Sequence, residues 1–143
     1  MALFSFIPAR TMSTFMQKTL FLGFLTFIFA LCSFKSFSGL DDVISALKAG
    51  NAQELAKYID DNIIISLPDK TDSYSKAQSI VVLQDFFANN GVKGFELQFK
   101  GENGGSQFCV GKLITKSGSY RTTVFMKTKN GRQLVKEIRF RDE

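Results

Sequence analysis

Four carboxylates in this sequence could act as a general base, if the fold placed one of them in an apolar pocket that raises its pKa. They are Asp69, Asp72, Asp85 and Glu137. Each also has a structural interpretation: the first two lie in a polar segment, Asp85 faces water, and Glu137 pairs with Arg139 or Arg121. Because the chain has no histidine, it cannot form a Ser/His or Cys/His pair, an imidazole base or a His-ligated metal site. We therefore assign no catalytic residue and expect neither a metal nor a cofactor.

Hydroxyl and thiol side chains offer two further kinds of chemistry. The tyrosines that could donate a hydrogen bond to an oxyanion are Tyr58, Tyr74 and Tyr120. A half-buried tyrosine usually packs its ring and keeps its hydroxyl hydrated. Cys109 could be a nucleophile if a cation such as Lys112 lowered its pKa. A cysteine in an alternating strand is more often a small buried side chain, and this is the interpretation we favour.

The net charge of +5 arises largely from the first 38 residues. This segment has three basic residues, no acidic residue and nine of the sixteen phenylalanines, whereas residues 39–143 hold 15 basic and 13 acidic side chains. The basic stretch KTKNGRQLVKEIRFR alternates its charges with apolar residues, as one exposed face of a strand does. Without a basic stripe beside an aromatic stacking platform, the sequence does not indicate a nucleic-acid partner.

Residues 1–38 have the pattern of a signal peptide. Leu20–Leu31 is uncharged, and even the longer run Thr19–Phe34 would form a helix of only roughly 24 Å, short of the ~30 Å hydrocarbon core of a bilayer. Lys18 supplies the positive flank of such a leader. We predict export to the periplasm or beyond, with membrane contact only through the leader; an uncleaved anchor is the alternative. Three methionines could be the start of translation: Met1, Met12 and Met16.

Two positions after this run fit signal peptidase, which requires small residues three positions and one position before the cut. One cut follows Cys32, with Ala30 before it, and the other follows Ser38, with Ser36 before it. We favour the cut at 32/33 over that at 38/39, because it retains Ser38 as a helix cap and keeps the new ammonium away from the positive end of the helix dipole. Lipidation of Cys32 is disfavoured by the bulky Leu31 before it.

Three helices are predicted after the leader, at residues 40–49, 52–59 and 76–88. The first two repeat apolar residues at positions i, i+3, i+4 and i+7, which is the spacing of one helical face. Residues 51–54 and 75–78 have the pattern of capping boxes for the second and third helices.

The rest of the chain indicates five strands. Residues 62–68, NIIISLP, form the first, and residues 69–75 are a polar loop. From Gly94 the hydrophobic period changes to two, with hairpin turns expected at Ser117-Gly118 and Asn130-Gly131. The four later strands are expected at residues 95–100, 106–115, 119–128 and 132–141. The sequence thus predicts one α+β domain, residues 39–143, in the order α-α-β-α-β-β-β-β, with three N-terminal helices packed on a curved, mostly antiparallel sheet.

The simplest hairpin register divides the last three strands into two faces. The face expected to be the core holds Phe108, Val110, Ile114, Phe125, Leu134, Ile138 and Phe140. The opposite face is too apolar for free solvation, and a second copy could cover it. Its candidate dimer residues are Leu113, Tyr120, Val124, Met126 and Val135. A β-bulge would exchange part of this assignment.

The order of elements resembles the nuclear transport factor 2-like (NTF2-like) superfamily, a cystatin-like α+β cone. The pieces YSKAQ, DFF and GSYRTTVFMK…EIRF, within a body from about Gly39 to Asp142, are similar to an exported bacterial family, domain of unknown function 4783. The resemblance implies a cone with an internal pocket and pairing of copies through the sheet. That family has no assigned activity, so the resemblance transfers no catalytic residue.

Our functional hypothesis is an exported, non-catalytic binding domain, which could form a homodimer. Its ligand would be a small apolar molecule or an envelope protein held in the cone, with Tyr58, Phe86 and Phe87 on the helical wall. A cofactor-free isomerase or hydratase using a pocket carboxylate is the first alternative, and a structural subunit of an envelope complex is the second. An open pocket with a buried carboxylate would favour the enzyme, whereas a cone filled by its own phenylalanines would remove both pocket functions.

Overall fold

The computed structural model describes residues 39–143. The predicted signal peptide, its cleavage sites and Cys32 lie outside the described residues, so export stays a prediction. Within the described part of the chain, no helix has the length and apolarity that crossing a membrane requires.

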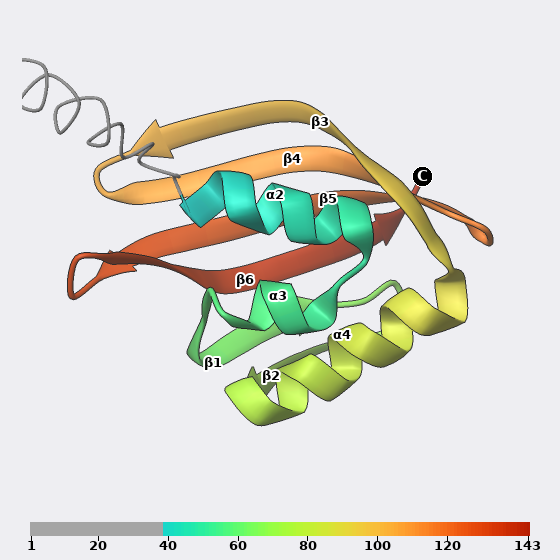
Figure 1. The fold of residues 1–143 in the computed structure, drawn as a ribbon, viewed down its shortest axis with the longest axis horizontal. Helices are drawn as coiled ribbons and strands as arrows, with labels where there is room; N and C mark the ends of the chain where they lie inside the picture. Colours follow the sequence, from blue (N-terminus) through green and yellow to red (C-terminus); the bar gives the residue numbers. More distant parts are fainter. Residues whose placement is uncertain (1–38) are drawn as a thin grey trace, which may run out of the picture. The chain divides into compact units, whose positions relative to one another are not determined.

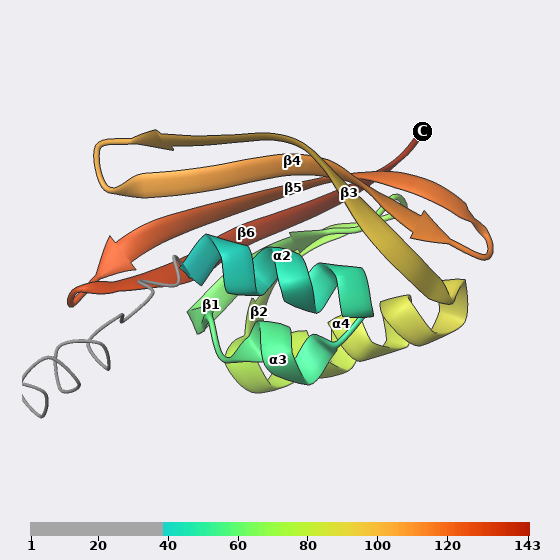
Figure 2. The same ribbon diagram turned by 45° about the horizontal axis from the view of Figure 1, so that its top comes forward.

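Within residues 39–143, three helices lie on one side of a curved, six-stranded sheet (Figures 1 and 2). They are α2 (Gly39–Ala49), α3 (Ala52–Ala56) and α4 (Lys76–Asn90). The sheet-facing stripe of α2 is its buried set, Leu40, Val43, Ile44, Ala46 and Leu47, which confirms the spacing seen in the sequence.

Side-chain caps fix where α3 and α4 begin. The side-chain oxygen of Asn51 accepts from the backbone N–H of Glu54 at 3.1 Å, which satisfies a donor that the helix itself leaves unpaired. The carboxylate of Glu54 binds Lys57 instead of returning to Asn51, so this box is half formed. At α4 the box between Ser75 and Gln78 is complete.

The strand order in the sheet is β2-β1-β6-β5-β4-β3. The strands are β1 (Ile59–Ser66), β2 (Thr71–Ser75), β3 (Val92–Asn103), β4 (Ser106–Thr115), β5 (Gly118–Lys129) and β6 (Arg132–Asp142). Neighbouring strands are antiparallel except β1 and β6, which are parallel. The predicted α+β fold is therefore confirmed.

Three local predictions were wrong. Residues 71–75 form β2 rather than a loop, because their backbone pairs with β1 at the sheet edge, where polar side chains remain hydrated. Ile59 begins β1 instead of ending a helix. Thr115 pairs with Gly118, so the turn between β4 and β5 is residues 116–117 and not Ser117-Gly118.

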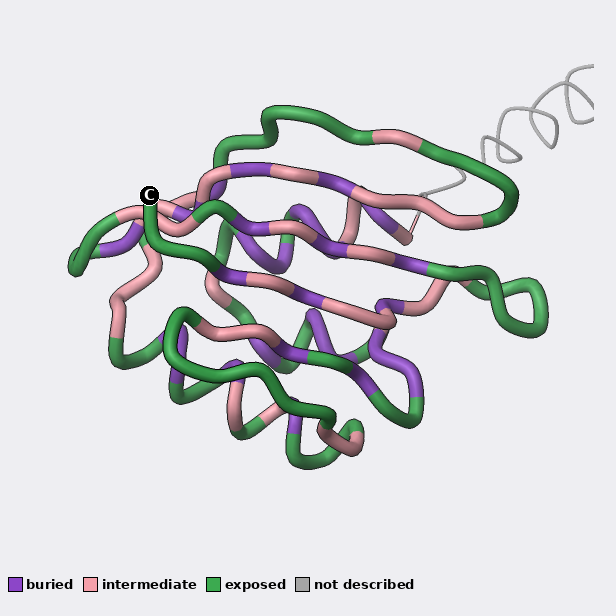
Figure 3. The backbone as a smooth tube through the Cα atoms, turned by 180° about the vertical axis from the view of Figure 1, so that it is seen from behind, coloured by how far each residue is buried: buried purple, intermediate pink, exposed green. Residues whose placement is uncertain are grey.

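A β-bulge in β6 reverses the predicted faces of the sheet. Met126 pairs with Val135 but Phe125 pairs with Glu137, which leaves Lys136 as the extra residue. One extra residue shifts the alternation, so everything after it changes face. Ile138 and Phe140 therefore join the face that we had assigned to a dimer. Figure 3 shows the resulting alternation of buried and half-buried residues along the central strands.

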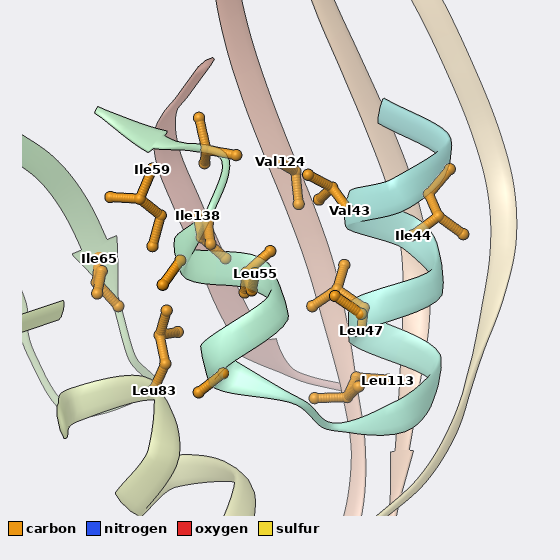
Figure 4. Packing of buried hydrophobic residues seen from close by; sticks show 14 of the residues in the cluster. Val43, Ile44, Leu47, Leu55, Ile59, Ile65, Leu83, Leu113, Val124 and Ile138 are labelled. Atoms are coloured by element: carbon orange, nitrogen blue, oxygen red, sulfur yellow. The ribbon is translucent and has the colours of Figure 1, made fainter. Parts of the chain in front are cut away.

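The predicted dimer face is thus the core of the domain. Leu113, Val124, Met126 and Val135 are fully buried against the helices, and Tyr120 is half-buried and packs against them. Figure 4 shows Leu113 and Val124 of the sheet facing Val43 and Leu47 of α2, with Leu55 of α3 beside them. The four fully buried residues therefore face the helices and offer no surface to a second copy.

The edge strand β3 departs from regular pairing twice. Its register with β4 shifts between Val92 and Gly94 and again between Leu97 and Phe99. The second shift follows a buried Phe95 and leaves Leu97 and Phe99 exposed.

Candidate functional site

Aromatic side chains fill the interior where we expected a ligand. Phe86 and Phe87 of α4 are buried and lie against Phe140 of β6, with ring centroids 4.6 Å and 6.1 Å from it. The ring of Tyr120 meets Phe86 edge-on at 5.2 Å, and its hydroxyl donates to the side-chain oxygen of Asn90 at 2.7 Å. The two phenylalanines that we assigned to a pocket wall are therefore packing residues.

Tyr58 lies at the other end of the interior from Phe86. The Tyr58 ring lies near Met126, because a Cβ built on Gly39 would be 3.5 Å from the ring and 3.6 Å from Met126. Phe86 instead packs on Tyr120, which lies six residues before Met126 on β5. At about 3.3 Å per residue, these ends are about 20 Å apart. The Tyr58 hydroxyl donates to Asp42 at 2.6 Å, and this bond raises its pKa to about 12. The three predicted ligand residues do not form one site.

The candidate carboxylates do not converge on the interior either. Asp69, Asp72 and Asp85 are exposed. Glu137 is half-buried on the outer face of the sheet and accepts from the guanidinium of Arg139. Cys109 is buried, which raises its thiol pKa to about 11, so the interpretation as a small core side chain is confirmed.

A hollow of about 620 Å³ opens on the outer face of the sheet, the face that the helices leave uncovered. We call it the outer hollow, and its lining residues come from β1, β2, β4, β5 and β6. They are Asn62, Ile63, Ile64, Ser73, Ser106, Phe125, Met126, Lys127, Lys136 and Glu137. Ile63 and Met126 are fully buried and belong to the core, while Ile64 is 43% exposed.

The outer hollow lies where two neighbouring strands are both irregular. From Ile59 to Ile64, β1 advances five residues while its partner β6 advances only two, from Val135 to Glu137. The bulge residue of β6, Lys136, falls in the same interval. Because neither strand keeps a regular ladder there, the sheet surface is interrupted between β1 and β6.

A buried charge cluster stands at this interruption. Asp60 is only 4% exposed, and its carboxylate accepts from Lys136, from Lys129 at 3.0 Å, and from the backbone N–H of Asp61 at 2.8 Å. The bonds to Lys136 and Lys129 hold the pKa of Asp60 well below its ordinary range and outweigh the effect of burial. Asp60 is the one buried carboxylate among residues 39–143, and its lowered pKa makes it a poor base.

Three phenylalanines form an aromatic row beside the outer hollow. Phe99, Phe108 and Phe125 lie on β3, β4 and β5, with successive centroid distances of 5.6 Å and 6.2 Å. The guanidinium of Arg139 lies over the Phe125 ring, 5.3 Å from its centroid. Gly101 leaves room for this row, because a Cβ there would come within 2.7 Å of the Phe108 ring.

The family model of DUF4783, a domain of unknown function, matches residues 40–141. The chain belongs to this family. A crystal structure of a DUF4783 protein from Bacteroides ovatus is 31% identical, with a TM-score of 0.70, over 71% of this chain and 93% of that one. One from Bacteroides uniformis is 29% identical, with a TM-score of 0.70, over 72% and 95%.

An NTF2-like protein of unknown function from Cytophaga hutchinsonii has a TM-score of 0.54 over 73% of this chain and 86% of that one. At 10% identity this likeness shows the fold alone: the described domain has an NTF2-like fold. No protein of curated function matches the chain.

Sequence reasoning missed the residues that shape the outer hollow of this DUF4783 domain. The sequence analysis places Asp60 between the helix predicted at residues 52–59 and the strand predicted at residues 62–68, and Lys136 among the alternating charges of a basic stretch. One signal was present: the apolar residues Val135 and Ile138 are three positions apart, a spacing that fits a bulge better than strict alternation.

Proposed function

We propose that this DUF4783 domain is an exported, non-catalytic binding domain whose ligand is a small, largely apolar molecule bound in the outer hollow. The observation that carries the proposal is the contrast between the two sides of the sheet. Phe86 and Phe140 pack against each other inside, whereas Ile64 and Phe125 line an open hollow outside. Its volume of about 620 Å³ lies in the range of small-molecule sites.

The charges of the described residues favour binding over catalysis. An isomerase or hydratase needs a carboxylate that is basic near neutral pH. Asp60 is held in its ionised form by two lysines, and Glu137 is bound by Arg139. Asp60 is therefore a poor base, and the Glu137 carboxylate is already engaged in an ion pair.

Native mass spectrometry of the protein purified from the cell envelope tests the proposal. We expect a retained ligand on the wild-type protein, and its loss in Ile64→Trp, whose larger side chain fills the outer hollow. Val81→Trp is the matched control, because Val81 is 57% exposed on α4, which does not line the hollow. Circular dichroism would confirm that both variants fold.

Two results would contradict this function. A ligand that stays bound to Ile64→Trp would lie elsewhere in the protein. A wild-type protein that carries no ligand, yet co-purifies with other envelope proteins, would support the structural-subunit alternative.

Self-association through β3 and β4 is a second candidate, favoured by the aromatic row. Phe99 at the end of the row is 58% exposed, and an exposed apolar patch on a protein surface often marks a protein–protein contact. Sedimentation should show a dimer that Phe99→Glu dissociates and Val81→Glu does not. If the wild-type protein is a monomer at high concentration, self-association is rejected, and the proposal of a ligand in the outer hollow is unaffected.

A further inference from the structure

We infer that the ligand of the outer hollow is an amphipathic anion, an alkyl carboxylate whose head group binds Lys127. This inference rests on the function proposed above and deepens it. It depends on the distribution of charge around the rim of the hollow and on the positions of the apolar side chains that line it.

The rim of the outer hollow carries three charged groups, and two of them are already paired. Glu137 accepts from Arg139, and Lys136 donates to Asp60. Lys127 forms no salt bridge with any residue between 39 and 143. An anionic ligand could therefore pair with Lys127 without breaking an existing ion pair.

The net charge of the strands around the hollow also favours an anionic ligand. Residues 106–143, which form β4, β5 and β6, contain nine basic and three acidic side chains, whereas residues 39–105 contain six basic and ten acidic ones. The strands that supply most of the hollow's lining are thus the positive half of the domain. A local excess of one charge raises the concentration of the opposite ion near the surface.

Two apolar side chains that line the hollow, Phe125 and Ile64, lie within reach of Lys127, with Glu137 between them. Phe125 is two residues from Lys127 on the same face of β5, about 7 Å away along the strand. Phe125 pairs with Glu137, which in turn pairs with Ile64, so two strand spacings, about 10 Å, separate the two apolar residues. A tail that starts at Lys127 can cross Phe125, pass Glu137, whose charge is paired with Arg139, and end over Ile64.

One hydroxyl lies beside the expected head group. Ser106 of β4 pairs directly with Lys127 of β5, and both line the hollow. A hydroxyl next to an ammonium can donate a second hydrogen bond to a carboxylate. The paired residues therefore supply a charged donor and a neutral donor at the same end of the site.

Isothermal titration with three ten-carbon probes that differ only in head group tests this inference. The probes are decanoate, decanol and decyltrimethylammonium, each below its micelle-forming concentration, and the protein is the chain purified after expression in a host that exports it. We expect decanoate to bind about fivefold or more tightly than decanol, and the cation to bind more weakly than both. Lys127→Gln should remove the preference for decanoate over decanol.

Lys116→Gln is the matched control, because Lys116 is an exposed lysine in the β4–β5 turn and should not alter the preference. Equal binding of decanoate and decanol, or a preference that survives Lys127→Gln, would overturn the inference. If decanol binds to the wild-type protein but not to Ile64→Trp, this result would still support an apolar site in the outer hollow. Failure of the inference is therefore distinguishable from failure of the proposed function.

Discussion

Asp60 and Lys136 hydrogen-bond each other at the point where both of their strands leave regular pairing. Lys136 is the bulge residue of β6, and Asp60 begins the irregular interval of β1. The contact joins two chain segments that are 76 residues apart. It holds the edges of the interruption together and thereby keeps the outer hollow in shape.

Asp60→Asn should lower the free energy of unfolding by about 1–3 kcal/mol at pH 7, because two lysines lose a buried partner. The loss stays below that of a fully buried pair because Lys129 and Lys136 are 45% and 39% exposed and water screens them. Urea unfolding would measure it. Asp61→Asn is the control, since Asp61 is 87% exposed and should change little.

The same pair predicts a pH dependence. The folded-state pKa of Asp60 is lowered, so its stabilisation is fully present above the ordinary carboxyl pKa near 4 and is lost as pH falls through the folded value. Wild-type stability should therefore fall below about pH 4 more steeply than that of Asp60→Asn. Parallel curves for the two proteins would show that Asp60 does not titrate as the structure indicates.

Gly111→Ala should destabilise the domain by about 2 kcal/mol or more, since a Cβ there would lie 2.5 Å from the backbone oxygen of Glu96 and 2.3 Å from the Phe95 ring. Gly94→Ala is the matched control in the adjoining strand. A Cβ at Gly94 meets nothing within 4 Å, so this change should be neutral or slightly stabilising. Thermal unfolding of the two variants would distinguish them, and equal melting temperatures would contradict the close approach of β3 to β4.

Cys109 should be unreactive in the folded protein. Its thiol pKa of about 11, raised from 9.0 by burial, reduces the thiolate fraction about 100-fold, and the absence of solvent access slows reaction further. In a Cys32→Ser background, a thiol reagent should label Cys109 at least about 100-fold faster in urea than in buffer. Rapid labelling of the native protein would mean that the β4–β5 core opens readily.

Arg121→Glu should stabilise the sheet by about 0.5 kcal/mol. Arg121 is exposed and pairs directly with Lys112 on one side and Arg141 on the other, and like charges in such pairs repel. A glutamate would face two cations instead. Lys116→Glu in the adjoining turn makes the same charge change without cross-strand cations, and urea unfolding should show a smaller gain for it.

Local signals in the sequence predicted most of the fold. The cap of α3, the complete capping box of α4 and the Asn130-Gly131 turn act within a few residues, and all three are present. The parallel pairing of β1 with β6 joins residues 73 to 76 positions apart, and no local pattern encodes it.

The candidate site was less predictable for a physical reason. The alternation rule identified which residues of β4 and β5 share a face, but a single extra residue at Lys136 moved Ile138 and Phe140 to the opposite face. Because strict alternation assigns Ile138 and Phe140 to the outer face, it predicts that the outer face is the core. The outer hollow and its charge cluster arise from the same irregularity, so a method that assumes regular strands misses both.

The two register shifts in β3 also bear on how the protein avoids fibrous assembly. β3 is a twelve-residue strand at the edge of the sheet, and a long regular edge is a template on which further chains can add as strands. The shifts near Gly94 and Leu97 divide it into shorter regular runs. An incoming strand would lose register at each shift, so the irregular geometry of β3 discourages growth of an intermolecular sheet.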